Sequence, residues 1–176
     1  MCYNSINIQE WRLKMTEFLT EQLVKRKMTI VTTIKKVFLI LMAIVSLSLG
    51  MVHPMLVWVS VIIIIVDVIL FKRMNVEYEY IYYNGDLDID RILDKQSRKR
   101  IFSTSIKDME VIAPTGSIEL QQYQRVKELD YSSRDTEHKT YEMVTKFKGD
   151  MVRVVFEPNE KILTGMKSMA PRKVYI

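Results

Sequence analysis

The chain has 176 residues, a net charge of +5 and one cysteine, Cys2, which excludes an intramolecular disulfide and a zinc site built from several thiolates. Before residue 37 there are seven Lys or Arg and three acidic residues, whereas from Lys72 onward there are nineteen Lys or Arg and seventeen acidic residues. The excess basic charge therefore flanks an apolar block instead of forming a polynucleotide groove, and we expect no nucleic-acid partner.

The segment 1–36 precedes the apolar block and contains a helical repeat. Amphipathic positions recur every three or four residues, at Trp11, Met15, Phe18, Leu19, Gln22 and Leu23. This spacing predicts an amphipathic helix, lying either on the inner membrane surface or against the domain that follows. Residues 1–14 show little periodicity, so Met15 is an alternative start to Met1.

Residues 37–71 predict a hairpin of two transmembrane helices. The segments 37–52 and 55–71 contain one charged residue, Asp67, and each is near the lower limit for crossing a hydrocarbon core of about 30 Å. A single span over the whole block would exceed a bilayer and would place Pro54 at its centre. The block also starts too late and runs too long for a cleaved signal peptide.

Basic residues flank this block on both sides and are absent from its turn. They are Lys25, Arg26, Lys27, Lys35 and Lys36 before the first span, and Lys72 and Arg73 after the second. The positive-inside rule then predicts a multi-pass protein of the cell membrane with both termini in the cytoplasm.

Small residues line one face of the first span. Ala43, Ser46 and Gly50 recur at intervals of three and four, which allows a partner helix to approach closely. We expect this face to pack inside the hairpin, against Ser60, while a homo-oligomer remains the alternative use.

Asp67 is the one acidic residue inside a predicted span. Such a residue is a candidate for ion or proton handling, or it pairs with Lys35, Lys36 or Lys72 near the cytoplasmic end. Structural pairing or a helix–helix contact is the interpretation that we favour, because a two-helix hairpin has no evident ion pathway.

The region 74–176 predicts a cytoplasmic β domain of the α+β class. From Val76 to Tyr82, apolar or aromatic residues occupy every second position, which is typical of a strand. Asn84 with Gly85 is then a strong hairpin signal. The expected strands are 76–82, 86–90, 99–104, 109–113, 124–131, 141–147 and 151–156. A helical stripe at 159–170 then stops before Pro171. About seven antiparallel strands in a barrel or sandwich, capped by a C-terminal helix, are expected.

Several stretches resemble a clostridial-type (Firmicutes) family of two-span membrane proteins. They read TEQLVKRK, VEYEYIYYNGDLDIDRI, RKRI, IAPTGS, VVFEPNEKIL and MAPRKVY, and the resemblance covers nearly everything from Thr16 onward. The soluble part is similar to bacterial pleckstrin-homology-like (PH-like) domains attached to membrane spans. The resemblance implies this architecture and no particular activity.

A basic turn is the candidate lipid-binding site. Its residues are Lys95, Arg98, Lys99 and Arg100. Cations at this position would contact anionic headgroups if the turn lay against the membrane, and a solvated loop is the alternative.

Acidic and aromatic residues of the first two strands have structural interpretations. Asp86, Asp88 and Asp90 resemble a calcium loop, but Arg91 occupies the position where glycine is needed, so we expect a solvated strand face and no metal site. The row of tyrosines from Tyr78 is expected to fill a sheet face.

No catalytic residues are assigned, because Cys2, His53 and His138 lie in unrelated segments and no nucleophile is placed beside a base. No cofactor and no small-molecule substrate are expected. The sequence therefore favours a non-enzymatic, membrane-anchored interaction module whose partners are the lipid bilayer and a protein, or a second copy of the chain. The alternative is a small accessory subunit of a transporter or sensor complex.

Overall fold

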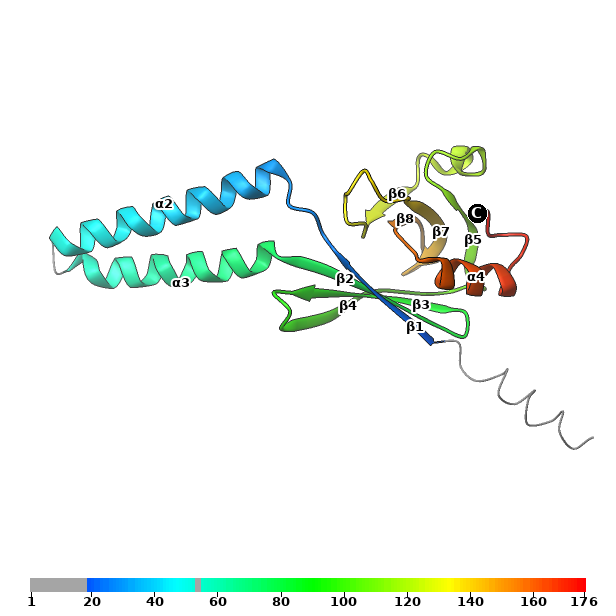
Figure 1. Ribbon diagram of the computed structural model, residues 1–176, viewed down its shortest axis with the longest axis horizontal. Helices are drawn as coiled ribbons and strands as arrows, with labels where there is room; N and C mark the ends of the chain where they lie inside the picture. Colours follow the sequence, from blue (N-terminus) through cyan, green and yellow to red (C-terminus); the bar gives the residue numbers. More distant parts are fainter. Residues whose placement is uncertain (1–18, 53–54) are drawn as a thin grey trace, which may run out of the picture.

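The computed structural model describes residues 19–52 and 55–176, which form a long helical pair joined to a β domain (Figure 1). The elements of this part are β1 (Leu19–Lys25), α2 (Ile30–Val52), α3 (Leu56–Met74), β2 (Val76–Tyr83), β3 (Asp86–Leu93), β4 (Ser97–Ser105), β5 (Met109–Pro114), η1 (Ile118–Tyr123), β6 (Lys127–Asp130), β7 (Tyr141–Phe147), β8 (Asp150–Phe156) and α4 (Glu160–Met169). The helical pair extends away from the domain. In the chain it is inserted between β1 and β2, which are neighbours in one sheet.

Leu19–Lys25 form strand β1, so the amphipathic helix predicted over these residues was wrong. Leu19 and Leu23 are four residues apart, a spacing that also places two side chains on one face of a strand. Antiparallel pairing with β2 supplies the backbone hydrogen bonds that select the strand. The β domain therefore begins before the helical pair and not at residue 74. Trp11, Met15 and Phe18, as well as the choice between Met1 and Met15, lie outside the described residues.

Helices lie where both transmembrane segments were predicted. The first begins at Ile30 and not at Val37, and the second ends at Met74 and not at Phe71. Within the described residues, α2 alone is long and apolar enough to cross a membrane, with a mean hydropathy of 2.1 and 6% of its apolar window buried. Length and composition of this kind fit a membrane span or a signal sequence.

The first sheet is antiparallel in the order β1-β2-β3-β4. Its β2–β3 turn is formed by Asn84 and Gly85, both with positive φ, as expected for a tight hairpin. A bulge in the β3–β4 pairing places Phe102 opposite Ile89 but Arg100 opposite Asp90. Arg98 and Arg100 of β4 consequently lie on the same face as Asp88 and Asp90 of β3.

The second sheet has the order β5-β7-β8-β6, and β6 runs parallel to β8. The prediction of antiparallel strands alone was therefore wrong for this edge. The strand predicted at 124–131 is confined to Lys127–Asp130, because the chain first forms η1 and then turns, with the amide of Val126 donating to the carbonyl of Tyr123 (3.1 Å). In the part of the chain that the structure describes, the strands form two four-stranded sheets and no closed barrel.

The core lies between the two sheets and under α4. Tyr80, Tyr82 and Phe102 from the first sheet meet Phe156 from the second, and all four side chains are at most 1% exposed. Burial raises the pKa of Tyr82 to about 12. Tyr78, Tyr80 and Tyr82 therefore fill a sheet face, as expected, whereas Tyr83 is exposed.

Helix α4 covers the core at the position of the predicted C-terminal helix. Its N-cap is Asn159, whose side-chain oxygen accepts from the amide of Ile162 (2.8 Å). Ile162, Leu163 and Met166 of this helix are buried in the main core.

Candidate functional site

The connections between the helical pair and the β domain are short. Residues 26–29 join β1 to α2, and Asn75 alone separates α3 from β2. The side chain of Asn75 accepts from Nζ of Lys36 (2.9 Å) and donates to Oδ1 of Asp94 (3.3 Å). One amide thus ties α2 to the β3–β4 turn at the base of the helices.

Within the helical pair, the small residues of α2 contact α3. Ser46, Gly50 and Ser60 are buried, and Oγ of Ser60 donates to the backbone carbonyls of Ser46 and Leu56. A methyl group at Gly50 would come within 3.0 Å of Oγ of Ser60. This close approach places part of the small-residue face inside the pair, while Ala43 is half-buried beside an open groove.

Asp67 borders that groove, a largely apolar space of about 320 Å³ between α2 and α3. Its Oδ2 is buried and has no hydrogen-bond partner among the described residues. Within the described residues no ion pair joins it to Lys35, Lys36 or Lys72, and Nζ of Lys36 donates to Asn75 (2.9 Å). The carboxylate therefore faces the groove between the helices without the expected basic partner.

The predicted basic turn is mostly a strand, because Arg98, Lys99 and Arg100 belong to β4 and Lys95 alone lies in the preceding turn. The two arginines bind the acidic residues of the neighbouring strands. Nε of Arg98 is 2.8 Å from Oδ2 of Asp90, and Nη1 of Arg100 is 2.8 Å from Oδ2 of Asp88.

These ion pairs also correct the expectation of a solvated acidic face at Asp90, whereas Asp86 is exposed as expected. The side chain of Asp90 is 8% exposed, since it lies between Arg98 and Arg100 and accepts from both. Arg98 contacts Glu79 as well. Cations with carboxylate partners attract phosphate less strongly, and lipid binding at Lys95, Arg98, Lys99 and Arg100 stays a prediction.

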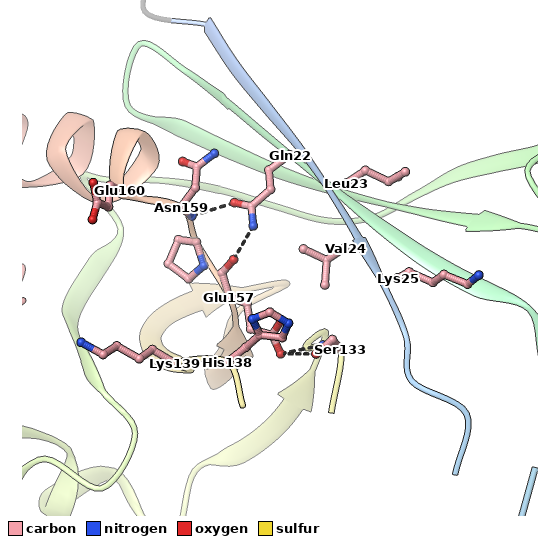
Figure 2. A pocket seen from close by; sticks show the side chains of 11 residues that line it. Gln22, Leu23, Val24, Lys25, Ser133, His138, Lys139, Glu157, Asn159 and Glu160 are labelled. Atoms are coloured by element: carbon pink, nitrogen blue, oxygen red, sulfur yellow. Dashed lines mark hydrogen bonds between the residues drawn. The ribbon is translucent and has the colours of Figure 1, made fainter. Parts of the chain in front are cut away.

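A cleft of about 590 Å³ lies beside β1, between that strand and the segment that joins β8 to α4 (Figure 2). Gln22 points from β1 into this space. Its Nε2 donates to the carbonyl of Glu157 (2.7 Å), and its Oε1 accepts from the amide of Asn159 (2.7 Å). The Glu157 carboxylate accepts in turn from the amide (2.8 Å) and the hydroxyl (2.7 Å) of Ser133.

The polar groups of this cleft form hydrogen bonds that join separate segments of the fold. The Ser133 hydroxyl donates to Glu157 and accepts from the amide of Asp135 (2.9 Å), and its residue is buried. His138 is exposed in the same cleft. The Ser133 hydroxyl is thereby engaged in ordering its loop.

Residues 130–135, which we call the clamp loop, fasten the β1–α2 connection. Arg26 binds Asp130 (3.3 Å) and donates to the Tyr78 hydroxyl (2.8 Å). The backbone amide of Lys27 donates to the carbonyl of Ser133 (2.7 Å). The chain is therefore held against the second sheet at the point where it enters α2.

Electrostatics strengthen this clamp. Partial burial acts to raise the pKa of the Asp130 carboxyl, but hydrogen bonds from Ser132 and Arg134 outweigh it and hold that pKa below its ordinary value. The hydrogen bond and charge of Asp135 raise the pKa of Lys27, whose Nζ lies 2.9 Å away.

Sequence reasoning missed Gln22, Glu157 and the clamp loop. The loop did carry a signal, because the run DYSSRD from Asp130 to Asp135 is rich in Asp and Ser, whose side chains form Asx and Ser turns. Its partner, the segment after β1, offered none, since the contact joins positions about a hundred residues apart.

Two β-sheets packed over a common core and a covering C-terminal helix define a small β domain, interrupted by a helical pair. The chain belongs to the family described as Bacterial PH-like domain (DUF6106), whose model matches residues 16–176. Comparison with curated proteins finds no match, and neither does comparison with solved structures.

Membership in this family confirms the predicted PH-like character of the soluble part. PH-like domains are generally non-enzymatic binding modules. The clostridial type and the two membrane spans stay predictions.

Proposed function

We propose that this protein is a membrane-anchored binding module, in which α2 and α3 cross the bilayer as a hairpin and hold the PH-like domain at its cytoplasmic face. One observation carries the proposal. Lys25, the last residue of β1, and Glu77, near the start of β2, are Cα partners in the first sheet. The chain therefore leaves the domain for the helical pair and returns to it at the same place.

This register constrains how α2 can span a membrane. With 23 residues, α2 is about 34 Å long, enough for a hydrocarbon core of about 30 Å. A single crossing would leave β1 and β2 on opposite sides, where they cannot pair. Helix α3 is shorter, about 28 Å for its 19 residues, and contains Asp67, Lys72 and Arg73. We assign it the return crossing because β2 must lie on the same side as β1. The same pairing argues against a cleaved signal sequence, because cleavage would separate β1 from its sheet.

The surface of the helical pair supports a lipid environment. Apolar side chains point outward along both helices, including Phe38 (59% exposed) and Ile62 (62% exposed). A soluble protein rarely exposes a continuous apolar surface of this extent, because its contact with water is unfavourable. Trp58 is exposed near the tip, where an indole suits a membrane interface.

Charge supports the cytoplasmic orientation. Lys35, Lys36, Lys72 and Arg73 all lie at the end of the pair that adjoins the β domain. The positive-inside rule places this end in the cytoplasm. An anchored domain meets its partners at high effective concentration, so weak binding of a protein segment or a lipid is sufficient.

Cysteine labelling in intact cells tests the anchor. In a Cys2→Ser background, Met51→Cys at the tip is expected to react with a membrane-impermeant maleimide added outside. Thr136→Cys in the β domain is expected to react only after the cells are permeabilised. Labelling of Thr136→Cys from outside, or release of the chain by carbonate, would overturn the proposal.

Asp67 favours a second candidate function, that of an accessory subunit in a larger membrane complex. Its buried, unpartnered Oδ2 beside an apolar groove suits docking of a polar residue from another span. Native electrophoresis of detergent-solubilised membranes tests it: Asp67→Leu should reduce the size of the complex, whereas Val66→Leu should not. An equal size for both variants and the wild type would exclude this role.

A further inference from the structure

A second cleft, which we call the junction cleft, lies where α2, α3 and the clamp loop meet. It has a volume of about 360 Å³ and is lined by five cationic side chains: Arg26, Lys27, Lys35, Arg73 and Arg134. No carboxylate residue lines it in the described part of the chain. Three separate segments contribute these cations, so the cluster is a product of the fold and not of one basic run.

The positive charge in this cleft is only partly neutralised. Arg26 and Arg134 share the carboxylate of Asp130, and Lys27 binds that of Asp135. The side chains of Lys35 and Arg73 form no hydrogen bond or ion pair with another described residue. Five cations thus face two carboxylates, which leaves a surplus of three positive charges.

The start of α2 adds to this field. Thr29 and Thr32 line the cleft, so the first turn of the helix borders it, and that turn contains no acidic residue. The first amides of a helix have no intrahelical acceptor, and their partial positive charge favours an anion. The guanidinium of Arg73 complements these amides, since it can bind two phosphate oxygens at once.

We propose that the junction cleft binds the phosphate of an anionic phospholipid headgroup from the cytoplasmic leaflet. The inference rests on the proposed anchor, which places the cytoplasmic ends of α2 and α3 at headgroup depth. Lipid phosphate is the most concentrated anion at that depth, and the surplus of charge matches a headgroup with net negative charge. The cleft differs from the Arg98 and Arg100 face, where carboxylates already occupy the cations.

Lipid retention by the full chain tests this proposal. The protein is incorporated into nanodiscs of phosphatidylcholine with a graded fraction of phosphatidylglycerol, and lipid adducts are counted by native mass spectrometry after release. The wild type is expected to retain phosphatidylglycerol selectively. Lys35→Gln with Arg73→Gln should weaken this retention by about tenfold or more.

A charge-matched control distinguishes the cleft from general basicity. Lys107→Gln with Arg125→Gln removes the same charge from exposed sites on the β domain and should retain lipid like the wild type. Equal retention in the cleft variant and the wild type would overturn the proposal, as would equal losses in both variants. Full competition by inorganic phosphate would assign the cleft to a soluble anion and would also overturn it.

Failure of the anchor gives a different result. A wild-type chain that does not enter nanodiscs overturns both proposals, whereas a chain that enters them without lipid selectivity overturns this one alone. Lys35 and Arg73 are exposed, so their replacement should leave the fold intact. The thermal unfolding temperature of both double variants should confirm that.

Discussion

Gln22 accepts a hydrogen bond from the backbone amide of Asn159, a residue 137 positions further along the chain, at 2.7 Å. The same side chain donates to the carbonyl of Glu157. Strand β1 is thus paired with β2 in its own sheet and is joined to the segment after β8 by the side chain of Gln22.

Replacing Gln22 with methionine should therefore loosen β1. Gln22→Met keeps the volume but removes both hydrogen bonds and leaves two backbone groups without partners, at a cost of about 1 to 3 kcal/mol. Hydrogen exchange should show a lower opening free energy for the amides of β1. The matched variant Glu21→Met, on the exposed face of the same strand, should leave that exchange unchanged. Equal exchange in both variants would contradict this role for Gln22.

The two sheets should be coupled through a pair of buried hydroxyls. Oγ1 of Thr104 in β4 lies 2.7 Å from Oγ1 of Thr145 in β7. Thr104→Val leaves the other hydroxyl buried without a partner, which costs about 1 to 3 kcal/mol of unfolding free energy, whereas the double valine variant leaves none. Urea unfolding of a double-mutant cycle should give a cost for the double variant below the sum of the singles. Additive costs would show that the pair contributes nothing.

Local signals made much of the fold predictable. Strands β2 and β3 adjoin each other around Asn84 and Gly85, and α4 has its cap and its apolar stripe within a dozen residues. In such elements the pattern and its structural cause lie in the same short stretch. Strand β1 lacked this advantage, because its partner follows only after the whole helical pair.

The sites depended on register, which a single sequence does not specify. The bulge at Asp90 brings Arg100 opposite this residue, whereas unbroken pairing from Ile89 would have set Ile101 there. The acidic and basic patches of β3 and β4 were therefore both recognised in the sequence, but their mutual neutralisation was not. The junction cleft likewise needs three segments whose proximity exists only in the folded chain.

Close packing of the helical pair predicts a steric effect at Gly50. Gly50→Ala brings a methyl group to within 3.0 Å of Oγ of Ser60 and should displace it from the carbonyl of Ser46, lowering stability by about 1 to 3 kcal/mol. Adding Ser60→Ala removes the clashing oxygen and should restore much of the loss. Unfolding in mixed micelles measures both, and a double variant less stable than Gly50→Ala would contradict the predicted clash.

The clamp loop should make stability depend on pH through Asp130. Its carboxylate accepts from the Ser132 amide (3.0 Å), the Ser132 hydroxyl (2.7 Å) and Nε of Arg134 (2.6 Å), and its pKa is lowered in the folded chain. A carboxyl with a folded pKa below its unfolded pKa stabilises the fold above the unfolded value, about 4, and loses that contribution as pH falls through the folded pKa.

Asp130→Asn should therefore cost about 1 kcal/mol of unfolding free energy at neutral pH, a figure kept small because the group is partly exposed to solvent. The difference from the wild type should stay constant down to about pH 5 and shrink below about pH 4. Urea unfolding across this range measures it in both proteins. A difference that persists undiminished in strong acid would mean that the variant acts through packing, and the charge of Asp130 would then not be the source of the clamp's stability.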